Sequence, residues 1–305
     1  MENNVQLYPN KQRIVPNCKF AKVITNLDDT QFDKMLQGDK RGIIEMKNHK
    51  KHGQVITNYQ ITNSNQDDQS DPLTMFDHAV LSVCVSEWEA GNRHTTPAII
   101  LRGLTGKSGT GGNGKIHKDQ RAAILHSIKK MMSLIIDINL TGTNQKLNYN
   151  GGQAQRITSA ILPAYFITNS INGQPIEDVI YFDRESPIMT IARDRKQILT
   201  FDSELLDVPN QQNTPMNITV KNYAMCRVQE CILHKLQPTI TFNDIFKKCR
   251  IENADNKIKQ RAREVLIKFL EHLQSKGVIS SFEVVKKSTA FYAIKFTFWY
   301  VKLDC

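Results

Sequence analysis

Long apolar runs are missing from this sequence. A helix needs about 20 consecutive apolar residues to cross a bilayer, and no stretch of the 305 residues approaches that length. The first ten residues, MENNVQLYPN, are polar and lack the apolar core of a signal peptide. We therefore expect a cytoplasmic protein without a membrane partner.

Metal-binding and redox motifs are missing as well. The 6 cysteines form no Cys-x-x-Cys pair, and neither they nor the 8 histidines have the spacing of zinc ligands. The sequence also lacks a His-x-His pair, a His-Glu-x-x-His motif and a calcium-loop motif. We expect reduced thiols, no bound metal and no cofactor.

One glycine-rich segment comes close to a nucleotide-binding motif. Residues 109–115 (GTGGNGK) match the first seven positions of a P-loop, but Ile116 stands where a Ser or Thr would bind magnesium. The segment also follows a predicted helix, whereas a P-loop follows a buried strand. We interpret it as a loop between helices, and we expect the chain not to be an enzyme.

A DNA-cleaving tyrosine enzyme or a nuclease is the catalytic alternative. No acid cluster and no histidine pair accompanies the tyrosines. Most of them fit better as aromatic residues of strands or of a core. The candidate nucleophiles for this alternative are Tyr149, Tyr165, Tyr181 and Tyr223.

Positive charge is what the sequence has in excess. It contains 40 Lys and Arg against 30 Asp and Glu, a formal net charge of +10. A net charge of this sign favours a polyanionic partner, and nucleic acid is the first candidate. Basic residues also outnumber acidic ones within residues 239–305, so this segment is the first candidate for DNA contact.

The C-terminal segment has the order of elements of a winged helix. A short helix over 242–248 is followed by a turn at 252–255 and by a long helix from about 256 to 277. Two strand-like runs come next, over 281–287 and 290–298. A helix-turn-helix closed by a β-hairpin places one helix in a DNA major groove and a loop beside the backbone.

The long helix has two different sides. Asp255 or Asn256 caps its start, and Gly277 stands where a left-handed residue ends a helix. One side carries an apolar stripe at helical spacing, formed by Ile258, Ala262, Val265, Leu266, Phe269, Leu270 and Leu273. Lys259 lies near the edge of that stripe. The opposite side and its flanks carry side chains that can contact bases and phosphates, namely Lys257, Gln260, Arg261 and Arg263.

The two strands follow a period of two residues. Tyr292, Ile294, Phe296 and Phe298 share one face in this pattern. Lys286 and Lys287 then lie at the tip of the wing, where they would contact DNA. The alternative is a winged helix that binds only protein, with lysines that solvate its surface.

The preceding part of the chain repeats this order. Helices are expected to begin at Asp71–Pro72, at Thr95–Thr96–Pro97 and at Lys118–Asp119. Strand-like runs follow over 134–140, 156–167, 178–182 and 197–201. Arg121, at the start of the third helix, is expected to pair with Glu87 or Glu89 or to contact DNA.

The expected fold class is therefore α+β, with two tandem winged-helix domains and a polar N-terminal extension. Residues 1–71 form a polar arm with a hairpin over Gly42–Met46 and Gln54–Ile61. Residues 72–210 form the first domain. Residues 211–305 form the second, which opens with a helix over 219–236.

Several stretches resemble replication initiators of plasmids and mobile elements. They are Phe76–Leu81, Trp88–Arg93, Thr95–Ile100, Lys118–Arg121 and Asn217–Tyr223. The resemblance implies a first domain for dimerisation and DNA backbone contact, and a second domain that reads the major groove. We accordingly expect Arg93, Thr95 and Lys118 to contact DNA.

The resemblance also implies a homodimer that binds double-stranded origin repeats, opens the duplex locally and recruits host replication proteins. A winged-helix transcriptional regulator is the alternative, because the same contacts serve both functions.

Overall fold

The computed structural model describes most of the chain. The chain divides into two compact units. Unit 1 is built mainly from residues 14–101 and 114–198, and unit 2 mainly from residues 11–13, 102–113 and 199–305. The described residues are 12–16, 42–49, 54–63, 73–107, 116–140, 146–171, 174–194, 196–234, 236–287 and 290–298.

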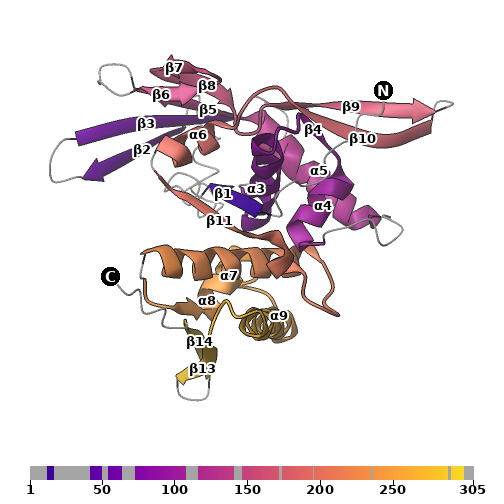
Figure 1. Cartoon of the computed structure of the whole chain (residues 1–305), viewed down its shortest axis with the longest axis vertical. Helices are drawn as coiled ribbons and strands as arrows, with labels where there is room; N and C mark the ends of the chain where they lie inside the picture. Colours follow the sequence, from indigo (N-terminus) through magenta and orange to yellow (C-terminus); the bar gives the residue numbers. More distant parts are fainter. Residues whose placement is uncertain are drawn as a thin grey trace. The chain divides into compact units, whose positions relative to one another are not determined.

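Both units combine helices with antiparallel sheets, which confirms the expected α+β class (Figure 1). The division of the chain falls at Ile198/Leu199. The domain boundary near residue 210 stays a prediction.

Unit 2 has the order helix, strand, helix, helix, hairpin. Its sheet has the strand order β12-β14-β13, so the last strand lies in the centre. The elements are α7 (Pro215–His234), β12 (Thr239–Thr241), α8 (Phe242–Lys248), α9 (Asn256–Ser275), β13 (Ser281–Lys287) and β14 (Ala290–Thr297).

Side-chain caps explain where the helices of unit 2 begin and end. The Asp255 carboxylate accepts a hydrogen bond of 2.8 Å from the Ile258 backbone N–H, and the Thr241 hydroxyl accepts one of 3.0 Å from Asp244 N–H. Gly277 has a φ of 72°, the left-handed conformation that favours glycine after a helix. The predicted cap at Asp255 and the predicted end at Gly277 are confirmed.

The apolar stripe of α9 forms the core of unit 2 from Ala262 onward. Ala262, Leu266, Phe269, Leu270 and Leu273 are fully buried. Ile258, predicted to belong to the stripe, is 37% exposed, because the first turn of the helix extends beyond the core.

A β-bulge changes which hairpin side chains face the core. Val285 lies opposite Ala293, but Lys286 lies opposite Phe291, so Tyr292 is an extra residue in β14. One extra residue reverses the alternation of faces. Tyr292 is therefore 48% exposed, whereas Ile294 and Phe296 are buried. The predicted common face of Tyr292 with Ile294 and Phe296 was wrong.

Unit 1 contains the same order of elements. Its sheet has the strand order β4-β10-β9, again with the last strand in the centre. The elements are α3 (Met75–Glu89), β4 (His94–Thr95), α4 (Pro97–Thr105, which ends in unit 2), α5 (Lys118–Ser133), β9 (Ala164–Ile171) and β10 (Gln174–Phe182).

The first helix of unit 1 begins later than predicted. Thr74 caps α3, and its side chain and that of Asp77 form a capping box, so the helix begins at Met75 and not at Pro72. Asp77 also accepts a bond of 2.9 Å from Lys130 on α5. The two side chains are only 3% and 6% exposed, so this ion pair joins α3 to α5 inside the core.

A second sheet combines an N-terminal hairpin with two strands that lie between α5 and the β9–β10 hairpin in the sequence. It has the order β2-β3-β5-β8, formed by β2 (Gly42–His49), β3 (Gln54–Asn63), β5 (Leu134–Asn139) and β8 (Arg156–Ala160). The hairpin of the N-terminal segment thus pairs with a strand that follows α5, with Ile61 opposite Ile136. The run predicted over 156–167 is divided between β8 and β9.

Shorter elements complete the fold. They are the β6–β7 pair (Leu147–Tyr149 and Gly152–Ala154), α6 (Pro187–Asp194), the 3-10 helix η1 (Ser203–Leu206) and the β1–β11 pair (Gln12–Pro16 and Ile198–Asp202). The helix α6 was not predicted from the sequence. The glycine-rich segment 109–115 lies outside the described residues.

Candidate nucleic-acid interface

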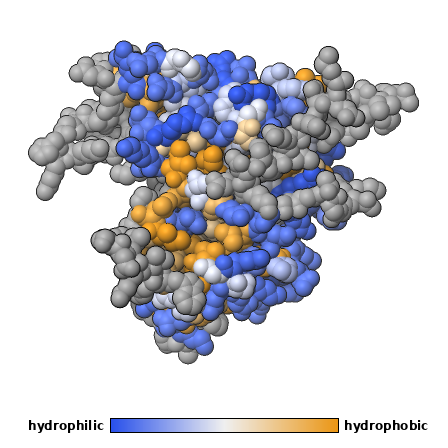
Figure 2. All heavy atoms as spheres, viewed as in Figure 1, coloured by the Kyte–Doolittle hydropathy of each residue, from blue (hydrophilic) through white to orange (hydrophobic). Residues whose placement is uncertain are grey.

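The exposed side of α9 carries most of the side chains predicted to contact DNA. Lys257, Gln260 and Arg261 are exposed in the first half of the helix. The Gln260 side chain donates a hydrogen bond of 3.0 Å to Glu264 one turn later. Figure 2 shows a hydrophilic surface around α9, whereas apolar residues gather over α7.

The charge at the start of α9 is unusual for a helix. Its first turn contains no acidic residue, although the amino end of a helix dipole favours negative charge. Lys257 and Arg261 add positive charge at this end, next to the capping Asp255. A phosphate group placed there would satisfy both the dipole and the cations.

Arg263 has a packing role that the sequence did not reveal. Its guanidinium lies 5.7 Å from the centre of the Phe242 ring and 5.1 Å from that of Phe246. The Lys259 ammonium lies 5.8 Å from the Phe246 ring centre. Both side chains are half-buried. Because a cation is attracted to the face of an aromatic ring, Arg263 and Lys259 join α9 to α8.

The hairpin presents further lysines. Lys286 is exposed in β13, next to the bulge. Lys287 pairs with Ala290 through its backbone, and its side chain lies outside the described residues. Lys295 is an exposed cation on β14 that sequence reasoning missed. Its neighbours Ile294 and Phe296 face the core, so strand alternation places Lys295 on the exposed face.

The three residues predicted in unit 1 differ in accessibility. Lys118 is exposed at the start of α5. The Arg93 guanidinium lies 3.8 Å from the centre of the Trp88 ring and donates a hydrogen bond of 3.0 Å to the Trp88 carbonyl. Thr95 is 0% exposed, because it faces inward from β4 where that strand pairs with Ile180. We therefore remove Thr95 from the predicted interface.

The candidate tyrosine nucleophiles have structural contacts. The Tyr149 hydroxyl donates to Ser159 Oγ and to the Glu185 carbonyl, and burial raises its pKa. Burial also raises the pKa of Tyr223. Tyr165 stacks on Tyr181 with ring centres 5.5 Å apart. A raised pKa disfavours the phenolate form that attacks a phosphate.

Two features are absent from the described part of the chain. Within it, no group of three or more His, Cys, Asp or Glu side chains could hold a metal ion. None of the helices described there is both long and apolar enough to cross a membrane.

No protein-family model matches this sequence, and neither does any curated protein. Among solved structures, the chain is similar to a crystal structure of RctB domains 2-3. The two share 15% identity with a TM-score of 0.41, over 87% of this chain and 96% of the other. A selenomethionine derivative of domains 2 and 3 of RctB gives 14% identity and a TM-score of 0.38, over 87% of this chain and 95% of the other. These values describe a distant likeness.

Proposed function

We propose that unit 2 is a winged helix that binds double-stranded DNA, with α9 in the major groove and the β13–β14 hairpin beside the backbone. The observation that carries the proposal is the exposed row of Lys257, Gln260 and Arg261 on the side of α9 opposite its buried stripe. Arginine and glutamine make paired hydrogen bonds to guanine and adenine edges, which gives the helix a means to read sequence.

The hairpin and unit 1 add backbone contacts in this proposal. Lys286 and Lys295 on the hairpin, with Arg93 and Lys118 of unit 1, are exposed cations that fit phosphate contacts. Unit 1 repeats the order of elements of unit 2, so we assign it the winged-helix fold as well. Arg263 acts indirectly here, by fixing α9 against the rings of α8.

The biological role that we propose is replication initiation on a plasmid or mobile element. A homodimer would bind repeated sites in an origin, promote local opening of the duplex and recruit host replication proteins. The repeated order of elements in the two units supports this role, together with the resemblance of the stretches around Trp88 and Asn217. A transcriptional regulator of the same fold is the second candidate.

Charge reversal on α9 tests the DNA-binding part of the proposal. The double variant Lys257→Glu/Arg261→Glu should weaken binding to DNA that flanks the gene by at least about 30-fold, since each base contact contributes about 1–3 kcal/mol. Lys268→Glu/Lys276→Glu is the matched control, because it makes the same charge change further along the helix. Fluorescence anisotropy measures both, and equal affinities for the two variants would contradict the proposal.

Replication and regulation are separated by a replicon assay. The gene and its adjacent noncoding DNA are placed on a plasmid without its own origin and introduced into a host. Autonomous replication that the double variant abolishes supports the initiator. Footprinting of the same DNA gives a second answer, since repeated protected sites favour an initiator and one palindrome favours a regulator.

A nicking assay tests the proposal that the chain is not an enzyme. Supercoiled DNA is incubated with the protein and magnesium, and we expect it to stay supercoiled. A nick or a covalent protein–DNA adduct would overturn this part of the proposal.

A further inference from the structure

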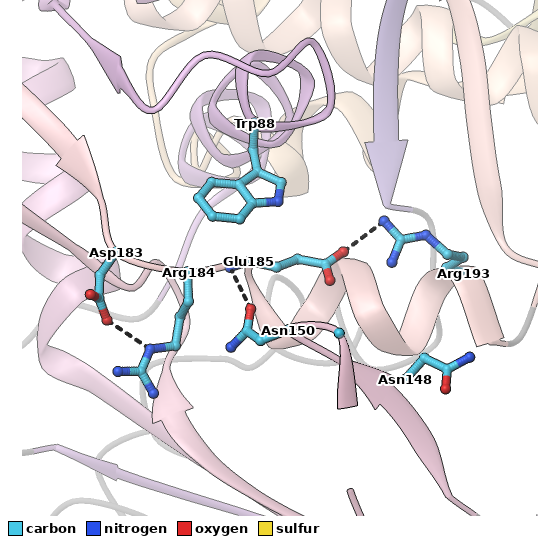
Figure 3. A pocket seen from close by; sticks show the side chains of 8 residues that line it. Trp88, Asn148, Asn150, Asp183, Arg184, Glu185 and Arg193 are labelled. Carbon is cyan, nitrogen blue, oxygen red and sulfur yellow. Dashed lines mark hydrogen bonds and ion pairs between the residues drawn. The ribbon is translucent and has the colours of Figure 1, made fainter. Parts of the chain in front are cut away.

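Unit 1 contains an open cavity of about 640 Å³, which we call the Trp88 pocket (Figure 3). Its walls come from α3, from the β6–β7 hairpin, from the loop between β10 and α6, and from α6. Pockets that bind small molecules typically measure about 300–1,000 Å³. The residues that matter for its chemistry are Trp88, Asn148, Asn150, Arg184, Glu185 and Arg193.

One wall of the Trp88 pocket is held in place by ion pairs and hydrogen bonds. Arg193 lies 2.7 Å from Glu185 and 2.5 Å from Glu89, and the Glu185 side chain is only 8% exposed. The Glu185 N–H donates to Asn150 Oδ1 over 3.3 Å, and its carbonyl accepts from the Tyr149 hydroxyl. This wall therefore has a fixed shape before a ligand binds.

The charges that line the Trp88 pocket are balanced. Arg184 pairs with Asp183 at 2.7 Å, and Arg193 pairs with Glu185 and Glu89. A cavity whose arginines already have carboxylate partners is poorly suited to a small anion, because the carboxylates repel it. The balance fits a neutral ligand that offers hydrogen-bond donors and acceptors.

The two sides of the cavity suit a flat ring with a polar edge. Figure 3 shows Trp88 on one side and Asn148 and Asn150 on the other. Arg93 covers one face of the indole, and the half-buried Trp88 side chain lines the cavity. Asn148 is exposed, and a side-chain amide can both donate to and accept from the edge of a nucleobase.

We propose that the Trp88 pocket binds a nucleobase, which stacks on Trp88 while its edge bonds the Asn148 amide. The base comes either from an unpaired DNA strand or from a free nucleoside. This site is separate from the duplex-binding surface of unit 2, and it adds a second mode of nucleic-acid recognition to the chain.

Tryptophan fluorescence tests this proposal directly. The chain has 2 tryptophans, Trp88 and Trp299, so the full-length Trp299→Phe variant reports on Trp88 alone. The probes are a single-stranded 12-mer of mixed sequence, the same 12-mer with abasic sites, and the four free nucleosides. We expect the normal 12-mer to quench Trp88 emission and the abasic 12-mer not to do so. If only the nucleosides quench Trp88 emission, the bound base comes from a free nucleoside and not from a DNA strand.

Two substitutions complete the test. Trp88→Ala should weaken binding of the 12-mer by about 5- to 100-fold, because stacking of one base on an aromatic ring contributes about 1–3 kcal/mol. Asn148→Ala, at an exposed position that leaves the fold intact, should weaken it by about 2- to 10-fold and reduce the quenching. Circular dichroism checks that both variants are folded.

The outcomes separate this proposal from the duplex-binding one. Trp88→Ala should keep duplex affinity, and Lys257→Glu/Arg261→Glu should keep the quenching by the 12-mer. Equal quenching by the normal and abasic 12-mers would overturn the nucleobase proposal. A second outcome would also overturn it. In that outcome, Asn148→Ala changes neither the quenching nor the affinity for the 12-mer, and Trp88→Ala does not change that affinity.

Discussion

Units 1 and 2 share an order of elements but differ in the charge of the corresponding helices. In each unit, two helices precede a hairpin whose second strand lies in the centre of a three-stranded sheet. On α9 of unit 2, Lys257 and Arg261 are exposed and the first turn has no acidic residue. On α5 of unit 1, Asp119 lies in the first turn and Arg121 pairs with Asp178 at 2.9 Å.

If α9 reads DNA as we propose, this difference means that the topology alone does not make a DNA-reading helix. An arginine held by a carboxylate of its own unit must exchange that partner for DNA, whereas exposed cations at a helix start gain a partner. The units also differ in what precedes the hairpin. In unit 1, strands β5 to β8 lie between α5 and the β9–β10 hairpin in the sequence, whereas in unit 2 the hairpin follows α9 after the short turn at Gly277.

The largest expected effect concerns the core of unit 1. Lys130→Met leaves the buried Asp77 carboxylate without its cation and should lower the free energy of unfolding by about 3–5 kcal/mol. Arg156→Met is the matched control, because Arg156 is exposed where it pairs with Asp137, and its loss should lower stability much less. Urea unfolding measures both, and equal losses would show that the buried pair has no special role.

The second effect sharpens the contrast between α9 and α5. Lys118→Glu/Lys129→Glu reverses two exposed charges on α5 and should weaken binding to cognate and scrambled duplexes by the same factor, since phosphate contacts carry no sequence information. The corresponding change on α9 should weaken binding to the cognate duplex by at least about 30-fold. Anisotropy titrations with cognate and scrambled duplexes measure the two affinities. A greater loss from the α5 variant would assign the reading helix to unit 1.

The third effect compares two left-handed glycines. Gly106 in unit 2 has a φ of 74°, and a Cβ there would lie 2.8 Å from the Asp207 backbone nitrogen. Gly106→Ala should therefore cost more than about 2 kcal/mol of stability. Gly91 in unit 1 has a φ of 89° and open space around it, so Gly91→Ala should cost only about 1 kcal/mol of backbone strain. Thermal unfolding of the two variants would show whether crowding of the added Cβ lowers stability beyond the effect of the left-handed conformation.

The smallest effect is a pH dependence of unit 2. Burial lowers the pKa of Lys221 to about 8, although its ammonium donates to the Leu206 carbonyl and to Asn213. Between pH 8 and the pKa of 10.5 of the unfolded chain, the unfolded state binds the extra proton, so stability rises with pH. We expect a gain of about 1 kcal/mol from pH 8 to pH 9 in urea unfolding. Lys221→Met should remove this rise, and a rise that persists would assign it to another group.

Much of unit 2 could be predicted from the sequence because its signals are local. The apolar spacing of α9, the capping Asp255 and the terminal Gly277 act over one or two helical turns, and the structure confirms them. The bounds of α8 and β13 agree for the same reason. The bulge at Tyr292 could not be predicted, because it depends on how β13 and β14 pair.

The candidate sites were less predictable, since accessibility depends on residues distant in the sequence. Arg121 was expected to pair with Glu87 or Glu89 or to contact DNA, but it pairs with Asp178, 57 residues later. Thr95 is buried by its pairing with Ile180. No sequence signal joins Trp88 with Asn148 and Arg193, which meet only because α3, β6 and α6 surround one cavity.

The sequence by itself determined the α+β class, the basic charge, helices α8 and α9 and the row of polar side chains on α9, because composition, periodicity and caps are local properties. Tertiary structure alone decided three other features. These are the pairing of the N-terminal hairpin with β5, the division of cations between exposed and ring-bound positions, and the Trp88 pocket. Each depends on contacts between segments far apart in the chain, whose registers and distances no local pattern encodes.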